Sequence, residues 1–309
     1  MTDQWHKSKI KTGGPGPFTT WIVQKHPASG FLHQTSRRRR KTLMPPIFHA
    51  QSHAPQEAIK NIKHHWSRVW AVSHLSWWIA ILFMIGAAHF AFASAMSLWP
   101  NLADTNPDVR RWIGFVYFLG SIFFTSAAYL QWMQAINNPL TTNGFATQFS
   151  RRSKTKFWGW RSRDLGYLSS AIQLVGTIFF NFNTGDALID GLNMKTYDAV
   201  VWVPNFLGSI CFLLASQFAV MEFSHATFSF KLRQLSWWIV AINMTGSILF
   251  MISAVVSFMS PGNLLNIPWL ADSGTFGGAI CFFTAAYLLI PEFFEKSERQ
   301  DDAPEAPLY

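Results

Sequence analysis

Six long apolar runs dominate this chain of 309 residues. A helix needs about 20 consecutive apolar residues to cross a bilayer, and each run is of that length. The runs cover residues 76 to 99, 112 to 134, 165 to 184, 199 to 221, 236 to 259 and 269 to 291. Only 13% of the residues are charged, against about a quarter in ordinary soluble proteins. We therefore predict an all-α fold, a polytopic transmembrane helical bundle with six spans.

The loops between the predicted spans alternate in charge. The 137 to 164 loop and the 223 to 235 loop are basic and contain Arg151, Arg152, Lys154, Lys156, Arg161, Arg163, Lys231 and Arg233. The other three loops hold fewer basic residues and carry Asp104, Asp108, Asp186, Asp190, Asp198 and Asp272. Lys and Arg are enriched in cytoplasmic loops. We therefore predict that the two basic loops and both termini are cytoplasmic.

The segments outside the spans differ in composition. Residues 1–53 include the basic run from Arg37 to Lys41 and show no sustained periodicity, which predicts a disordered basic cytoplasmic tail. Such a tail is typical of contact with anionic lipids, whereas a nucleic-acid partner is disfavoured; the alternative is an orientation signal with no specific ligand. Apolar residues at spacings of three and four predict an interfacial amphipathic helix over 54–73. Residues 293–309 are predicted to form an acidic cytoplasmic tail.

Every predicted span contains a glycine that is followed four residues later by a phenylalanine. The pairs are Gly86 and Phe90, Gly120 and Phe124, Gly176 and Phe180, Gly208 and Phe212, Gly246 and Phe250, and Gly278 and Phe282. Residues four apart lie on one helix face. Small residues on such a face let transmembrane helices approach closely. We therefore predict that these residues form the helix-packing faces of the bundle.

The residues around the glycines divide the spans into two alternating types. Odd-numbered spans open alike, as in Ser76-Trp77-Trp78 and Ser236-Trp237-Trp238, whereas even-numbered spans share Leu119-Gly120-Ser121-Ile122 and Leu207-Gly208-Ser209-Ile210. This alternation predicts that the repeated unit is a helical hairpin. The three hairpins cover 74–136, 165–222 and 235–292, and the basic loop 137–164 joins the first two.

The same residues carry a family resemblance. Short hydrophobic helices with the pattern GSxxF, as in Gly120-Ser121-Ile122-Phe123-Phe124 and Gly246-Ser247-Ile248-Leu249-Phe250, resemble the YrhK-like domain of bacterial membrane proteins. The resemblance covers residues 76 to 292. It implies a bacterial source, and hence the cytoplasmic (inner) membrane, but no established activity and no catalytic residues.

Polar side chains within the spans are candidates for a solute or ion pathway, because unpaired polar groups are costly in hydrocarbon. Gln173, Asn205 and Asn243 each lie three residues before a glycine, and His89 is the only histidine deep in a span. The alternative, which we favour, is that the amides form hydrogen bonds between helices. His89 would likewise bond a neighbouring helix.

Three further polar residues occupy matching positions in the even-numbered spans. Gln134, Glu222 and Glu292 each lie fourteen residues after the glycine, which places them at the predicted cytoplasmic ends. Glu222 and Glu292 would form the mouth of a cation pathway, or else are hydrated carboxylates paired with Lys231, Arg233 or Lys296.

Signatures of enzymes and cofactors do not occur in the sequence. It contains no nucleotide-binding loop, dinucleotide fingerprint, HExxH or GxSxG motif, and no cluster of metal ligands. We predict a non-catalytic membrane packing or partner-binding module without cofactor or metal, which contacts a membrane partner or a second copy of itself. The alternative is a small transporter or channel for an ion or small solute.

Overall fold

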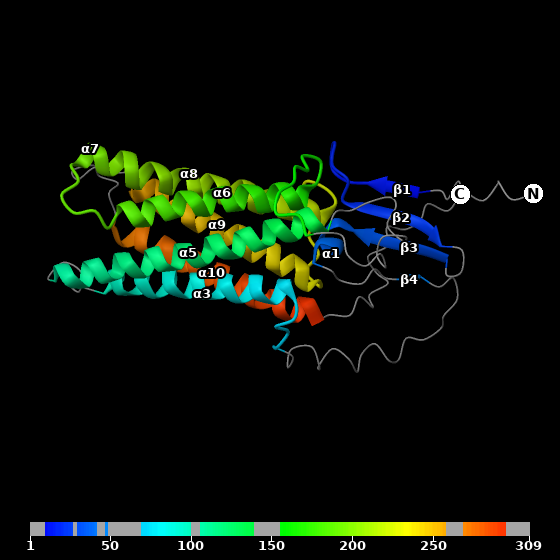
Figure 1. The fold of residues 1–309 in the computed structure, drawn as a ribbon, viewed down its shortest axis with the longest axis horizontal. Helices are drawn as coiled ribbons and strands as arrows, with labels where there is room; N and C mark the ends of the chain where they lie inside the picture. Colours follow the sequence, from blue (N-terminus) through cyan, green and yellow to red (C-terminus); the bar gives the residue numbers. More distant parts are fainter. Residues whose placement is uncertain are drawn as a thin grey trace, which may run out of the picture.

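The computed structural model describes residues 10–26, 30–41, 47–48, 69–99, 106–138, 155–257 and 268–294. These residues form a long helical bundle with a small β-sheet at one end (Figure 1). The predicted interfacial helix over 54–73 and the acidic tail over 293–309 lie almost entirely outside the described residues.

Six long helices make up the bundle. They are α3 (Leu75–Leu98), α5 (Pro107–Asn137), α6 (Leu165–Asp186), α8 (Val203–Ser224), α9 (Leu235–Ser257) and α10 (Pro268–Phe294). The short helix α7 (Met194–Tyr197) and the π-helical turn η1 (Asp198–Trp202) lead into α8. Each of the six has the length and the apolar composition needed to cross a membrane. The predicted all-α bundle is therefore confirmed, and the chain is a multi-pass membrane protein.

Local sequence explains where two of the helices begin. Asn106 accepts a hydrogen bond from the Asp108 backbone at the start of α5, and Pro107 occupies the first helical position, where its missing N–H costs nothing. Asp164 accepts hydrogen bonds from the backbone N–H groups of Gly166 and Tyr167 at the start of α6. These caps satisfy amide groups that the helix itself leaves without partners.

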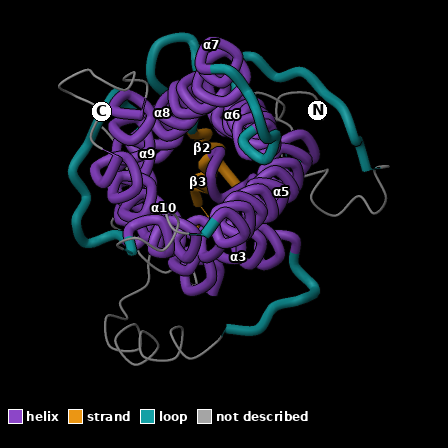
Figure 2. Tube along the Cα trace, turned by 90° about the vertical axis from the view of Figure 1, so that its left-hand side faces the viewer, coloured by secondary structure: helices purple, strands orange, loops and turns teal. Residues whose placement is uncertain are grey.

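The helices form a closed ring when viewed along the bundle axis (Figure 2). Each long helix packs against the next one in the chain, and α10 packs against α3 to close the ring. Three antiparallel hairpins result, namely α3 with α5, α6 with α8, and α9 with α10.

Glycines bring the two helices of each hairpin into close contact. A Cβ atom added to Gly86 would lie 3.0 Å from the carbonyl oxygen of Gly120, and one added to Gly208 would lie 3.1 Å from that of Gly176. In the third hairpin the carbonyl oxygen of Gly278 would lie 3.1 Å from a Cβ atom on Gly246. The structure thus places all six glycines of the predicted packing faces at contacts between helix backbones.

The six phenylalanines of the same faces meet in the centre of the ring. They are all at least 94% buried and belong to one hydrophobic cluster: Phe90, Phe124, Phe180, Phe212, Phe250 and Phe282. Their rings contact one another across hairpins, for example Phe90 with Phe250 at 5.9 Å and Phe124 with Phe282 at 6.2 Å between centroids. We refer to these six residues as the phenylalanine cluster.

The N-terminal region corrects a prediction. Instead of a disordered tail, the described part of residues 1–53 forms a four-stranded antiparallel sheet in the order β1-β2-β3-β4 and a short helix. The elements are β1 (Ile10–Gly13), β2 (Trp21–His26), β3 (Gly30–Thr35), α1 (Ser36–Arg40) and β4 (Ile47–Phe48).

Contact with the bundle explains why this polar segment is ordered. The consecutive residues Trp21, Ile22 and Val23 favour a strand. Thr20 is fully buried, and its hydroxyl lies 2.9 Å from Nδ1 of His225 at the end of α8. Phe18 packs against Phe218 of α8. Composition alone does not reveal such long-range contacts.

Candidate functional site

Helix α1 carries cationic side chains into the sheet end of the bundle. The hydroxyl of Thr35 caps this helix by accepting a hydrogen bond from the backbone N–H of Arg38. Positions 37, 40 and 41 share one helix face because they are three and four residues apart. Arg37, Arg40 and Lys41 are accordingly buried, with exposed fractions of 8%, 6% and 9%.

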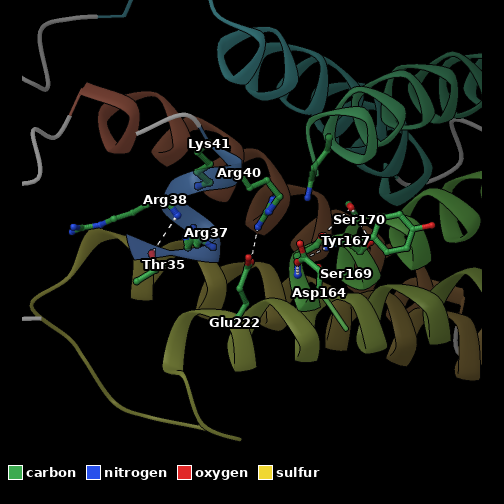
Figure 3. Close-up of polar contacts among 12 residues, drawn as sticks. Thr35, Arg37, Arg38, Arg40, Lys41, Asp164, Tyr167, Ser169, Ser170 and Glu222 are labelled. Carbon is green, nitrogen blue, oxygen red and sulfur yellow. Dashed lines mark hydrogen bonds and ion pairs between the residues drawn. The ribbon is translucent and has the colours of Figure 1, made fainter. Parts of the chain in front are cut away.

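These three cations form ion pairs with two glutamates of the bundle. Arg40 Nη2 lies 2.6 Å from Glu222 Oε2 of α8 (Figure 3). Arg37 donates to Glu292 Oε1 of α10 through Nε at 3.2 Å and Nη2 at 3.0 Å. Lys41 pairs with the other oxygen of Glu292. The pairs join residues 182 to 255 positions apart in the chain and fasten the N-terminal region to the bundle.

Burial also changes the proton affinity of charged groups outside the spans. Burial, together with the nearby charge of Arg37, lowers the pKa of Lys41 to about 7, although Glu292 opposes this shift. Burial raises the pKa of Asp164, and the charge of Glu222 adds to this effect.

The matching positions of the three hairpins meet at this end of the bundle. In the first hairpin Gln134 donates to the hydroxyl of Ser76 at 2.7 Å, and in the third Ser236 donates to Glu292 at 2.5 Å. In the second hairpin Gly166 takes the place of the serine beside Glu222. The structure therefore brings Gln134, Glu222 and Glu292 to one end as the sequence predicts. However, α1 covers the two glutamates, which do not form an open mouth.

Gly166 leaves room for the Arg40 side chain. A Cβ atom added to Gly166 would lie 2.5 Å from Glu222 Oε1 and 2.7 Å from Arg40 Nε. We expect Gly166→Ala to displace this ion pair and weaken the docking of α1 by about 1–2 kcal/mol, which would appear as faster tryptic cleavage between Arg37 and Lys41. Gly277→Ala is a matched control, because its added Cβ would meet only a flexible methyl group of Leu249. Equal cleavage rates for both variants would contradict the assignment of Gly166 to this role.

A cavity of about 100 Å³ lies between α1 and the phenylalanine cluster. At one end it is lined by Arg37, Arg40 and Lys41, and at the other by Phe124, Phe212 and Phe282. Polar groups on its wall are Ser76, Gln131, Gln134, Ser169, Gln173 and Asn243.

Only part of the predicted polar pathway reaches this cavity. Gln173 and Asn243 line it, whereas His89 and Asn205 do not. The hydrogen bond of His89 lies within its own helix and not with a neighbouring helix as predicted: Nδ1 donates to the carbonyl oxygen of Ile85 at 2.7 Å, and the ring packs against Phe123. Neighbouring helices are antiparallel. A residue three positions before the glycine therefore lies on the sheet side of that glycine in α6 and α9, but on the opposite side in α8. The phenylalanine cluster separates the two groups.

Sequence reasoning did not identify Arg37, Arg40 and Lys41 as partners of the glutamates. A signal did exist, since two glutamates at the ends of apolar spans require counter-charges when they are buried. The basic run at 37 to 41 is the densest source of such charges in the sequence.

Comparisons with known proteins found no matching family, no matching curated protein and no matching solved structure. Among the described residues, no group of three or more His, Cys, Asp and Glu side chains could hold a metal ion. Fold and site together define a multi-pass membrane protein whose helical ring is covered at one end by an N-terminal sheet held through buried ion pairs. The likeness to YrhK-like domains stays a prediction.

Proposed function

We propose that this protein is a non-catalytic membrane module that holds its N-terminal sheet at the membrane surface, where the sheet binds a partner. The observation that carries this proposal is the set of buried ion pairs from Arg37, Arg40 and Lys41 to Glu222 and Glu292. In a flexible tail these three cations would stay in water and would not be buried against the bundle. The pairs give the sheet a defined position on the bundle.

The edge of the sheet supports the choice of a partner-binding role. Among the described residues, β1 pairs only with β2, so its outer edge presents backbone groups that another strand could bind. Lys11 and Thr12 on this strand are exposed. The partner would be a membrane protein or a second copy of the chain.

We place the sheet and both termini on the cytoplasmic side of a bacterial inner membrane. The exposed basic residues Lys156, Arg163 and Arg233 lie in the loops at the sheet end, in agreement with the enrichment of positive charge in cytoplasmic loops. These exposed residues would contact anionic lipids, because Arg37, Arg40 and Lys41 are buried.

We also infer that the three hairpins arose by duplication of one unit. Corresponding side chains make corresponding bonds in the first and third hairpins. Trp77 Nε1 donates to the carbonyl of Val69, and Trp237 Nε1 donates to that of Ser229, eight residues earlier in both cases. Gly166 and Glu222 would then be the divergent counterparts of the serine–glutamate pair in the third hairpin.

A small transporter or channel is the second candidate, and the polar cavity favours it. Gln173 and Asn243 on the cavity wall are two of the residues expected along a pathway. The phenylalanine cluster, however, closes the centre of the ring beyond the cavity. Because these side chains fill the centre of the ring, we favour the non-catalytic membrane module over the transporter.

A flux measurement distinguishes these two functions. We expect purified protein in liposomes to give no proton or ion flux above that of protein-free vesicles, because apolar rings fill the axis of the bundle. Asn243→Leu and Asn205→Leu are matched variants, one inside the cavity and one outside it. Flux in the wild-type protein that Asn243→Leu abolishes and Asn205→Leu preserves would place the transporter first.

A further inference from the structure

We propose that the cavity between α1 and the phenylalanine cluster binds a short-chain monocarboxylate. Arg37, Arg40 and Lys41 would hold the carboxylate, and the apolar wall would contact the alkyl group. This inference concerns ligand binding within the bundle and is independent of the partner-binding role.

Charge is the first argument. The charged residues that line the cavity are all cations, namely Arg37, Arg40 and Lys41. Glu222 and Glu292 contact these cations but do not line the cavity, so its surface presents positive groups. A buried positive charge is stabilised by an anion within reach.

Arg40 supplies a donor that the ion pairs leave unused. Its Nη2 pairs with Glu222, whereas its Nε is buried and has no hydrogen-bond partner among the described residues. A carboxylate in the cavity, which Arg40 lines, could accept from this donor without disturbing the ion pairs that dock α1.

Hydrogen-bond donors on the wall favour a carboxylate over a spherical ion. A side-chain amide carries two N–H donors. Gln134, at the cationic end of the cavity, uses one toward Ser76 and retains the second. Guanidinium groups also match the planar geometry of a carboxylate.

Size and the opposite wall define the rest of the ligand. An apolar cavity of about 150 Å³ holds benzene, and a water molecule needs about 10–15 Å³. The cavity of about 100 Å³ therefore admits a carboxylate with a short alkyl chain but excludes nucleotides and sugars. Phe124, Phe212 and Phe282 provide the apolar end against which the alkyl chain packs.

Calorimetric titration of the purified protein in nanodiscs tests the proposal. We expect saturable binding of propionate and binding at least roughly tenfold weaker for propionamide, which has the same shape without the charge. Gln134→Leu removes the amide donor beside the cations and should weaken propionate binding by roughly tenfold. Asn205→Leu replaces an amide outside the cavity and should leave binding unchanged.

A second variant and a docking control make the result decisive. Ala286 lines the cavity and is 4% exposed, so Ala286→Leu should fill the space and abolish propionate binding even if Gln134→Leu fails to fold. Resistance to trypsin between Arg37 and Lys41 verifies that α1 is docked in each sample. No saturable binding of acetate, propionate or butyrate to docked protein would overturn the proposal. Equal affinity for propionamide, or equal loss in Asn205→Leu, would also overturn it.

Discussion

Glu222→Gln should release α1 from the bundle and expose the chain between Arg37 and Lys41 to trypsin. Glu222 is fully buried and Arg40 is 6% exposed, so the substitution leaves a buried guanidinium without its counter-charge. Removing one partner of a buried ion pair costs about 3–5 kcal/mol. Undocking of α1 relieves this cost, and we expect tryptic cleavage at this segment to accelerate by roughly 100-fold or more.

A double substitution provides the control for this experiment. Replacing both partners, in Arg40→Met with Glu222→Leu, removes the unpaired charge and should restore much of the resistance to trypsin. Gln134→Leu changes the matching position of the first hairpin, where the lost hydrogen bond to Ser76 is neutral, and should have a smaller effect. Unchanged resistance in Glu222→Gln would show that the ion pair does not hold α1 in place.

The sequence was sufficient to predict the helical bundle because the bilayer restricts what an apolar run can do. Within lipid a spanning segment must satisfy its own backbone groups, so length and hydropathy predict a helix. The second run, for example, was expected at 112 to 134 and lies within α5 (Pro107–Asn137). At its start the helix extends beyond the run through the polar turn from Pro107 to Arg111, which Asn106 caps.

The docking of the N-terminal region could not be predicted in the same way. Arg40 and Glu222 are 182 residues apart, and a local window around 37 to 41 contains only a dense positive charge. Such a run is ordinarily solvated. Its burial depends on carboxylates supplied by distant helices, and a single sequence does not indicate which charges will meet.

The prediction of a polar pathway was wrong in part, for a geometric reason. Gln173 and Asn205 have the same offset from their glycines, but α6 and α8 run in opposite directions, so only Gln173 reaches the cavity. Helix direction follows from the number of spans. The antiparallel order of the spans is therefore enough to assign the two residues to opposite sides of the glycine contacts.

Gly246→Leu should destabilise the bundle by at least about 3 kcal/mol, at the upper end of the cost of overpacking. A Cβ atom on Gly246 would lie 3.1 Å from the carbonyl oxygen of Gly278, which belongs to a helix backbone and cannot rotate away. The larger side chain would force α9 and α10 apart and disrupt the packing of Phe250 with Phe282. Titration with sodium dodecyl sulfate, followed by circular dichroism, measures the change in unfolding free energy.

The neighbouring residue supplies a matched control for this substitution. Thr245 is exposed on the outer face of α9, and its hydroxyl bonds only to the Ala241 carbonyl of the same helix. Thr245→Leu adds a leucine one position away, toward lipid, and should change stability by less than about 0.5 kcal/mol. Equal stability of the two variants would mean that Gly246 faces lipid, contrary to the ring geometry. Selective loss in Gly246→Leu would instead tie the stability of the bundle to the glycine contact within its third hairpin.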